Sequence, residues 1–190
     1  MTQDHALPPD TLPSDILLSG VHTVDESWID LYGHMNMVRY VALFDEVGYA
    51  LMEQWGLGET YTRDKGLGLF VVDVAVHYRR ELRAGTPLQV ALRLLDADDK
   101  RLLSLLEIRR TDDGTVAATM EQLSIHVDLG TRKVTPFPPP LAERLRALAA
   151  VQSAHPLPPR HRRRLHLAPT PSPAPGEGGA EGDRTGCRPA

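Results

Sequence analysis

Side chains that can do chemistry are concentrated in one short stretch of the chain, residues 28–40. Asp30 supplies a carboxylate, Gly33 a backbone without a side chain, and His34 and Asn36 further polar groups. An apolar segment with helical spacing begins directly after them, so they lie at the N-terminus of an expected helix. Unpaired N–H groups and the helix dipole favour negative charge there. A developing oxyanion is also stabilised by such donors, which makes this stretch the first candidate site.

One long amphipathic helix is expected to position these residues. Apolar residues recur at steps of three or four, namely Met37, Tyr40, Val41, Phe44, Val47, Gly48, Leu51 and Trp55. This spacing predicts a helix that begins near His34 and ends before Gly56. The helix has one broad apolar face, which another element must cover.

Strand patterns flank the helix. Residues 16–24 are expected to form a first strand, and residues 70–78, 88–95, 102–110 and 116–127 four more, before a short helix over residues 141–151. Alternation places Phe70, Val72, Val74, Val76 and Tyr78 on one face and Asp73 and His77 on the other. The short links predict an antiparallel meander wrapped around the helix, an α+β fold. One sheet face and the sheet edges remain open, so we expect a homodimer.

Composition limits the function. The chain is 42% hydrophobic, with a formal charge of −4, which gives no general case for nucleic-acid binding. Its single cysteine, Cys187, excludes a disulfide framework and a cysteine metal site, and the eight histidines show no metal-ligand spacing, so no metal is expected. We see neither a signal peptide nor a membrane-spanning run and expect a cytoplasmic protein that does not enter membranes.

Three regions are expected along the chain: a flexible leader over residues 1–15, a domain over residues 16–152, and a disordered tail over residues 153–190. Acidic residues exceed basic ones by seven through residue 152, whereas basic residues exceed acidic ones by three in the tail. The tail is rich in Pro, Gly and Arg, and such a composition buries little apolar surface. Its basic run over residues 160–164 either meets an anionic partner or is solvated. We expect deletion of residues 153–190 to leave activity intact.

The order of elements and the local pattern Asp-x-x-Gly-His-Met-Asn, with Tyr40 four residues after Asn36, resemble hotdog-fold acyl-CoA thioesterases of the 4-hydroxybenzoyl-CoA thioesterase type. The resemblance covers roughly residues 17–138 and includes His77-Tyr78-Arg79-Arg80. It implies a hotdog fold, hydrolysis of an acyl-CoA with no cofactor, because CoA is part of the substrate, and a site shared between the subunits of a homodimer or higher homo-oligomer.

The same resemblance implies roles for the residues around the helix start. Asp30 would act on the thioester carbonyl, as nucleophile or as base for water. The backbone N–H of Met37, where the family usually has an Asn, would polarise that carbonyl. Gly33 would allow close approach of the substrate, and His34 and Asn36 would orient water, Asp30 or the thioester. Each of these residues also has a purely structural alternative. Asp30 would cap the loop, Gly33 would adopt a positive φ, and the two polar residues that follow would form local hydrogen bonds.

Substrate-binding candidates lie mostly outside this stretch. The cationic ones are suited to the phosphates of CoA, or else are solvated charges: Arg79, Arg80, Arg132 and Lys133. Asp73 and His77 share a strand face and either line the pocket or face solvent or a partner subunit.

A narrower likeness concerns the acyl group. Three stretches are similar to the thioesterases of carnitine breakdown, namely Trp28-x-Asp30, residues 99–102 and residues 120–128. This likeness implies cleavage of betainyl-CoA to glycine betaine. Trp28 and Tyr32 flank Asp30 and are candidates to hold a trimethylammonium group, if they do not simply pack in the core. Two other functions stay open. One is a hotdog hydratase, whose Asn-Pro spacing the Asp30 stretch lacks, and the other is a non-catalytic acyl-CoA-binding module that binds CoA without turnover.

Overall fold

The computed structural model describes residues 15–167. Its helical elements are η1 (Glu26–Trp28), α1 (Met37–Met52), η2 (Glu53–Trp55), α2 (Glu59–Lys65) and α3 (Pro139–Gln152). Its strands are β1 (Leu17–Leu18), β2 (His22–Thr23), β3 (Leu67–Tyr78), β4 (Pro87–Ala97), β5 (Arg101–Arg110), β6 (Val116–Asp128) and β7 (Lys133–Val134).

The predicted long helix is confirmed as α1 followed directly by η2. It starts at Met37 because Asn36 is the N-cap, with extended backbone and a side chain that accepts a hydrogen bond from the Val38 N–H. It ends at Gly56, whose φ of 73° lies in the left-handed region that glycine adopts without steric strain. The apolar face that the spacing predicted is largely buried against the sheet, through residues that include Tyr40, Phe44 and Leu51.

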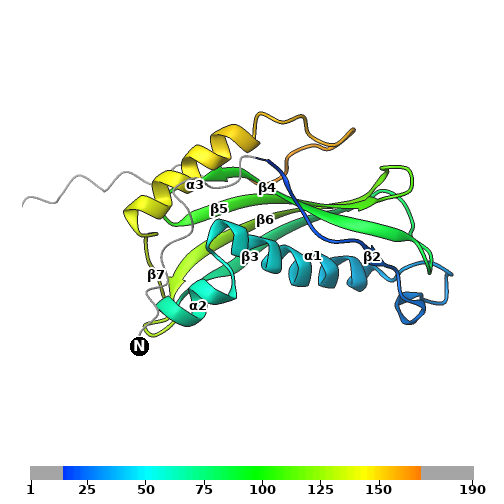
Figure 1. Ribbon diagram of the computed structural model, residues 1–190, viewed down its shortest axis with the longest axis horizontal. Helices are drawn as coiled ribbons and strands as arrows, with labels where there is room; N and C mark the ends of the chain where they lie inside the picture. Colours follow the sequence, from blue (N-terminus) through cyan, green and yellow to red (C-terminus); the bar gives the residue numbers. More distant parts are fainter. Residues whose placement is uncertain (1–14, 168–190) are drawn as a thin grey trace, which may run out of the picture.

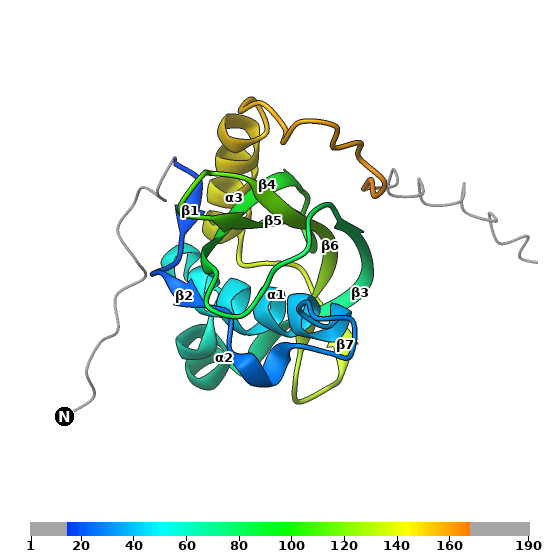
Figure 2. The ribbon, with the colours of Figure 1, turned by 90° about the vertical axis from the view of Figure 1, so that its right-hand side faces the viewer.

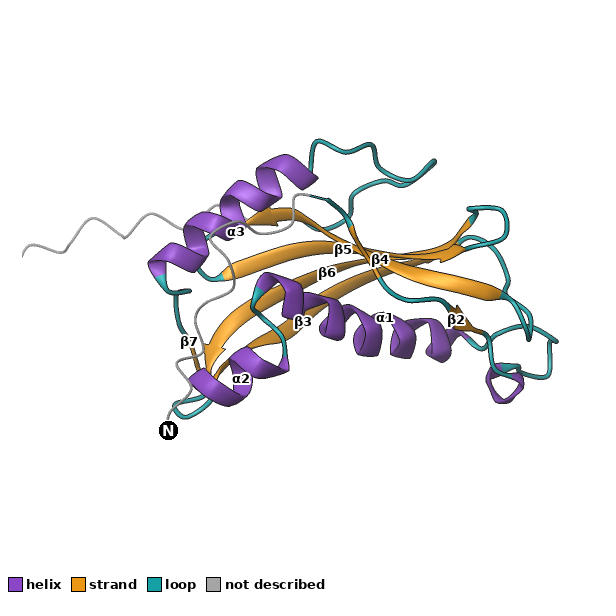
Figure 3. Cartoon of the chain, in the orientation of Figure 1, coloured by secondary structure: helices purple, strands orange, loops and turns teal. Residues whose placement is uncertain are grey.

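The sheet is antiparallel, with the strand order β1-β4-β5-β6-β3, and β2 and β7 add short pairings to β4 and β6. Figure 1 shows α1 beneath the sheet and α3 above it, and Figure 3 shows the same layers by type of element. Seen end-on, the sheet curves around α1 without closing (Figure 2). The predicted α+β fold, a long helix wrapped by a curved antiparallel sheet, is therefore confirmed.

The connection after β3 differs from the predicted meander. β3 pairs with β6 and not with β4, so only β4, β5 and β6 form a meander. Residues 79–86 instead cross to the far edge of the sheet, past the N-terminus of α1. The crossing is stabilised because Leu82 is buried and bonds to α1 and the preceding loop through its backbone. As a result, β3 is an edge strand, and its end lies beside the Asp30 loop.

A bulge in β3 changes which side chains face α1. The register with β6 shifts between Val71 and Asp73, and one extra residue reverses the alternation of a strand. The prediction that Phe70 shares a face with Val74 is therefore wrong, and Val71 takes that place. We use "outer face" for the side of the sheet turned away from α1; Asp73 and His77 lie on it, paired with Leu123 and Thr119.

The end of the described chain covers part of the outer face. α3 packs against β4, where the Gln152 side chain accepts a hydrogen bond from the Leu94 N–H. Residues 153–167, which we call the C-terminal segment, then lie across the outer face of β5 and β6. The prediction of disorder from residue 153 is wrong for this segment. The rest of the predicted tail and the predicted leader up to residue 14 lie outside the described residues.

Candidate active site

A tight loop presents Asp30 at the start of α1. Ile29 and Met35 form an isolated antiparallel bridge, and the Asp30 N–H donates to the His34 carbonyl at 3.1 Å. The Gly33 N–H donates back to the Asp30 carbonyl at 3.0 Å, with φ at 80°. This φ is one that glycine adopts readily, so Gly33 is needed for the turn itself. The loop therefore fixes the positions of Asp30 and Asn36 relative to each other.

The Asp30 carboxylate is half-buried and held from two sides. One oxygen accepts from the Tyr32 N–H at 2.9 Å, and the other accepts from the Asn36 side-chain Nδ2 at 3.4 Å. Asn36 also caps α1, because its Oδ1 accepts from the Val38 N–H at 3.0 Å. One asparagine thus orients both the helix terminus and the carboxylate.

The first turn of α1 offers one available donor. The Val38 N–H bonds to the Asn36 side chain and the Arg39 N–H to the Asn36 carbonyl. The Met37 N–H has no hydrogen-bond partner among residues 15–167. Its position at the positive end of the helix suits it to an oxyanion. Because this donor is a main-chain group, the presence of Met37 where the family usually has an Asn leaves it in place. The Met37 side chain itself is exposed.

Two tyrosines join this loop to the crossing segment. The Tyr40 hydroxyl donates to the Arg80 carbonyl at 3.3 Å and accepts from the Leu82 N–H at 3.1 Å. The Tyr78 hydroxyl donates to the Met37 carbonyl at 3.4 Å, and its ring meets that of Tyr40 edge-on at 5.3 Å. Burial raises the pKa of both hydroxyls, so they remain protonated donors. The sequence pattern did not indicate Tyr78 and Leu82 as site residues, because their positions depend on the crossover after β3.

A cavity of about 230 Å³ opens at this junction, and we call it the loop cavity. Its lining includes His34, Met37, Tyr40, Tyr78, Arg79 and Arg80. The structure therefore brings two candidates of the helix start, His34 and Met37, together with two of the four predicted phosphate-binding residues. Asp30, Gly33 and Asn36 are not among the residues that line this cavity. Among residues 15–167, no group of three His, Cys, Asp or Glu side chains could hold a metal ion. No helix in the same range has the length and apolar character of a membrane span.

The two proposed aromatic residues differ in their surroundings. Tyr32 is highly exposed, and its ring stacks with that of His34 at 6.1 Å between centroids. Trp28 packs against the main core, and its carbonyl accepts from the Asn36 N–H at 2.9 Å. Trp28 therefore supports the loop, whereas Tyr32 offers a face to a ligand.

The remaining candidates lie elsewhere in the chain. Asp73 and His77 lie on the outer face, with His77 beside His161 at 6.0 Å between rings. Of the two alternatives left open for these residues, this placement does not favour lining the pocket, because neither of them lines the loop cavity. Arg132 and Lys133 lie beside the start of β3, while Arg79 and Arg80 follow its end. A strand of that length separates the two pairs by about 35 Å, at ~3.3 Å per residue.

Two relatives by sequence carry betainyl-CoA thioesterase in their names. A protein of Agrobacterium fabrum, L-carnitine dehydrogenase/betainyl-CoA thioesterase, is 36% identical over 135 residues, 71% of this chain and 27% of the relative. The matched region thus spans about a quarter of that relative's length. A betainyl-CoA thioesterase of Pseudomonas aeruginosa is 29% identical over 145 residues, 76% of this chain and 91% of the relative.

Solved structures show the same fold. A Staphylococcus aureus protein determined in complex with CoA superposes with a TM-score of 0.68 at 25% identity, covering 80% of this chain and 96% of that one. A 1,4-dihydroxy-2-naphthoyl-CoA thioesterase of Synechocystis superposes with a TM-score of 0.59 at 17% identity, covering 69% of this chain and 96% of that one. The sequence model of the thioesterase-like superfamily matches residues 24–145, and the chain belongs to that superfamily.

Proposed function

We propose that the protein hydrolyses an acyl-CoA thioester to a carboxylic acid and free CoA. The observation that carries this proposal is the Asp30 carboxylate, held by Asn36 at the helix terminus where the Met37 N–H has no partner among residues 15–167. A carboxylate next to an oxyanion donor is the minimum that acyl transfer to water needs. Membership of the thioesterase-like superfamily supports the same reaction.

The reaction can follow two routes from this geometry. In both, the Met37 N–H donates to the thioester oxygen as negative charge develops there, and the CoA thiolate leaves. As nucleophile, Asp30 forms a mixed anhydride with the acyl carbon, which water then hydrolyses. As base, Asp30 takes the proton of a water that attacks the acyl carbon directly. Neither route uses a metal or an added cofactor, and we propose that none is required.

Betainyl-CoA is the substrate that we propose. The relatives from Agrobacterium fabrum and Pseudomonas aeruginosa are named for this thioester. In a betainyl group the quaternary nitrogen is only two bonds from the reacting carbonyl carbon, so any aromatic contact must be next to Asp30. Tyr32 is highly exposed and its N–H donates to the Asp30 carboxylate, and Tyr78 is about half exposed and lines the loop cavity. Aromatic surfaces of this kind attract a trimethylammonium group. The Asp30 carboxylate adds a favourable charge.

We further propose a homodimer formed by pairing of two β3 edges. β3 is a 12-residue edge strand in the described sheet, and Val71, Val72 and Val74 on it are about half exposed. A long apolar edge favours pairing with another chain. A two-fold axis makes that pairing antiparallel, which places the start of one β3 beside the end of the other. The partner's Arg132 and Lys133 would then approach Arg79 and Arg80. Because CoA thioesters are formed inside the cell, the proposed location is the cytoplasm.

Oligomeric state has its own test. Val74→Lys introduces a charge in the middle of the β3 edge and is expected to shift the molar mass measured by light scattering from dimer to monomer. Val151→Lys, at a similarly exposed valine of α3, is the matched control. A dimer that persists in the Val74 variant contradicts pairing through β3.

The function is tested by release of CoA, detected with a thiol-reactive dye. The panel is betainyl-CoA, 4-hydroxybenzoyl-CoA, one short and one long straight-chain acyl-CoA. We expect selective turnover of betainyl-CoA. Turnover of all the thioesters would support thioesterase activity but contradict betainyl-CoA as the specific substrate. CoA binding without any turnover would indicate a non-catalytic binding module.

The Asp30→Asn variant tests whether the Asp30 carboxylate carries out the reaction. Because general-base catalysis contributes about 10²- to 10⁴-fold, we expect kcat to fall at least about 100-fold while CoA affinity and melting temperature stay close to wild type. Asp25→Asn is the control, because Asp25 is a cap of η1 in the same connection. A near-normal kcat in the Asp30 variant would show that another group does the chemistry.

A further inference from the structure

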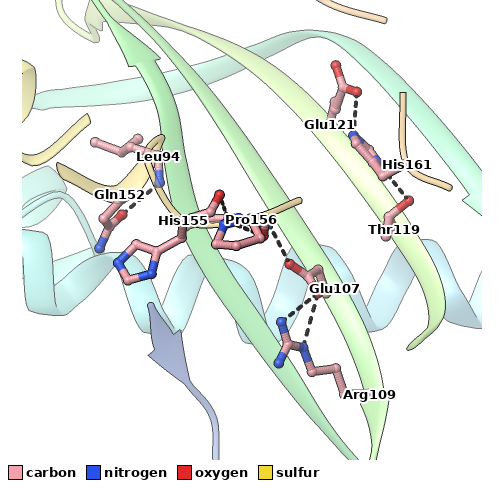
Figure 4. Close-up of polar contacts among 10 residues, drawn as sticks. Leu94, Glu107, Arg109, Thr119, Glu121, Gln152, His155, Pro156 and His161 are labelled. Carbon is pink, nitrogen blue, oxygen red and sulfur yellow. Dashed lines mark hydrogen bonds and ion pairs between the residues drawn. The ribbon is translucent and has the colours of Figure 1, made fainter. Parts of the chain in front are cut away.

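The C-terminal segment is fixed to the sheet by a buried carboxylate. Glu121 is fully buried on the outer face of β6. Its oxygens accept from His161 Nε2 at 2.9 Å, from the Arg164 N–H at 2.9 Å and from the Leu165 N–H at 2.7 Å. Figure 4 shows His161 between Glu121 and Thr119, the latter at 3.3 Å. Three donors on one buried carboxylate hold this part of the segment in a single position.

A second anchor lies nearer to α3. The Arg93 guanidinium is buried, pairs with Glu107 at 3.2 Å and donates to the carbonyls of His155 and Pro156 at 3.1 Å. Leucines of the segment complete the cover by packing on a second apolar cluster of the outer face, through Leu157, Leu165 and Leu167. The residues between the two anchors, Pro158 to Arg160, are therefore held over the end of the sheet.

Two of these intervening residues, Pro159 and Arg160, form one wall of a cavity of about 590 Å³, which we call the arginine cavity. Its other walls are Arg79 and Arg80 after β3 and the turn over residues 113–116. Arg79 joins the walls, because its Nη1 donates to the Pro159 carbonyl at 2.9 Å. Arg160 follows in a left-handed conformation, with φ at 63°. This conformation is uncommon for arginine, and the anchored segment maintains it.

The arginine cavity carries uncompensated positive charge. It shares Arg80 and Asp113 with a neighbouring cavity of about 400 Å³ that also contains Arg83 and Arg110. The latter two have carboxylate partners, at 2.9 Å to Glu81 for Arg83 and at 3.6 Å to Asp113 for Arg110. Arg79, Arg80 and Arg160, by contrast, form no ion pair with a carboxylate in the described part of the chain. Arginines that have no carboxylate partner are suited to binding phosphate oxygens.

The arginine cavity is continuous in its lining with the loop cavity, because Arg79 and Arg80 line both. Met37, whose N–H is the proposed oxyanion donor, lines the loop cavity. From there the CoA portion of a bound thioester can extend past these two arginines toward Arg160. We propose that Arg160, with Arg79 and Arg80, binds the phosphates of CoA, so that the C-terminal segment is part of the substrate site. This inference rests on the proposed function and adds to it a binding residue that lies 130 positions after Asp30 in the chain.

Arg160→Ala tests the proposal, with Arg162→Ala as the matched control. Arg162 is exposed in the same basic run and does not line the arginine cavity. Binding of CoA and of pantetheine, which lacks the phosphates of the nucleotide, is measured by calorimetry. A partly exposed arginine–phosphate contact predicts a loss of about three- to tenfold in CoA affinity for Arg160→Ala. Pantetheine affinity, and CoA affinity of the Arg162 variant, are expected to stay at wild-type values.

Turnover provides a second readout. With betainyl-CoA, Arg160→Ala is expected to raise KM by the same factor and to leave kcat unchanged, because a contact to the CoA phosphates is made equally in the bound substrate and in the transition state. Equal CoA affinity of the two alanine variants overturns the role of Arg160. If the wild type binds CoA with this dependence on Arg160 but releases no thiol from any substrate, the phosphate site stands and the proposed hydrolysis fails.

Discussion

Replacing Glu121 by Gln is the most direct probe of how the C-terminal segment is held. Gln has almost the same shape as Glu, but it replaces one acceptor oxygen by an NH₂ donor and removes the charge. The native carboxylate faces three donors, from His161, Arg164 and Leu165. Whichever way the amide turns, its NH₂ group therefore faces an N–H that it cannot accept from.

The size of the effect follows from this count of donors. A hydrogen bond to a charged group contributes about 1.5–3 kcal/mol to stability. The substitution removes at least one and weakens the others, so we expect release of the segment to become easier by about 2–3 kcal/mol. At about 1.4 kcal/mol for each factor of ten, the population of the released state should rise by roughly 30- to 150-fold. The segment follows α3, so it can detach while the sheet and α1 stay folded.

Trypsin detects this released state, because residues 160–164 contain four arginines. At low protease concentration the cleavage rate follows the population of the open form. We expect cleavage within residues 160–164, measured by intact mass, to accelerate by the factor given above in Glu121→Gln. Glu143→Gln, at an exposed position of α3, should behave as wild type. Cleavage of the Glu121 variant at the wild-type rate would refute the anchoring role of this carboxylate.

Three further predictions concern the segment, the helix and pH. A chain that ends at residue 167 should keep the wild-type melting temperature and CoA affinity. A chain that ends at residue 152 exposes the outer-face leucines, so its melting temperature and its CoA affinity should both be lower. Equal values for the two truncated chains would support the expectation that residues 153–190 are dispensable. Gly48→Ala should lower the melting temperature, because the new Cβ would lie 2.4 Å from Leu106 Cδ2 and overpacking costs about 1–3 kcal/mol; a rise would mean that helix propensity, about 1 kcal/mol in favour of Ala, outweighs the contact. Burial lowers the pKa of His126 and His161, so below pH 6.5 the unfolded chain binds protons that the folded one does not. Stability to urea should therefore be constant above that pH and fall as pH decreases toward the lowered values, by up to about 1.4 kcal/mol per pH unit for each histidine; stability that is unchanged from pH 7.5 to 5.5 contradicts this.

Much of the site is encoded locally and could be predicted from the sequence. The spacing of apolar residues from Met37 to Trp55 predicted the helix, and the polar stretch before it predicted the loop that carries Asp30. Both depend on contacts between residues close in the chain, namely capping by Asn36 and the turn at Gly33. For that reason sequence pattern and structure agree there.

The tertiary structure alone decided what surrounds this loop. Alternation cannot distinguish pairing of β3 with β4 from pairing with β6, nor can it locate the bulge after Val71, so the face of Asp73 and His77 was open. Composition predicted disorder beyond residue 153 because prolines and arginines bury little apolar surface. It could not show that Glu121, 40 positions before His161, provides a buried acceptor for that segment. Long-range pairing of this kind depends on which polar groups the folded sheet leaves without partners, and the sequence by itself does not specify that.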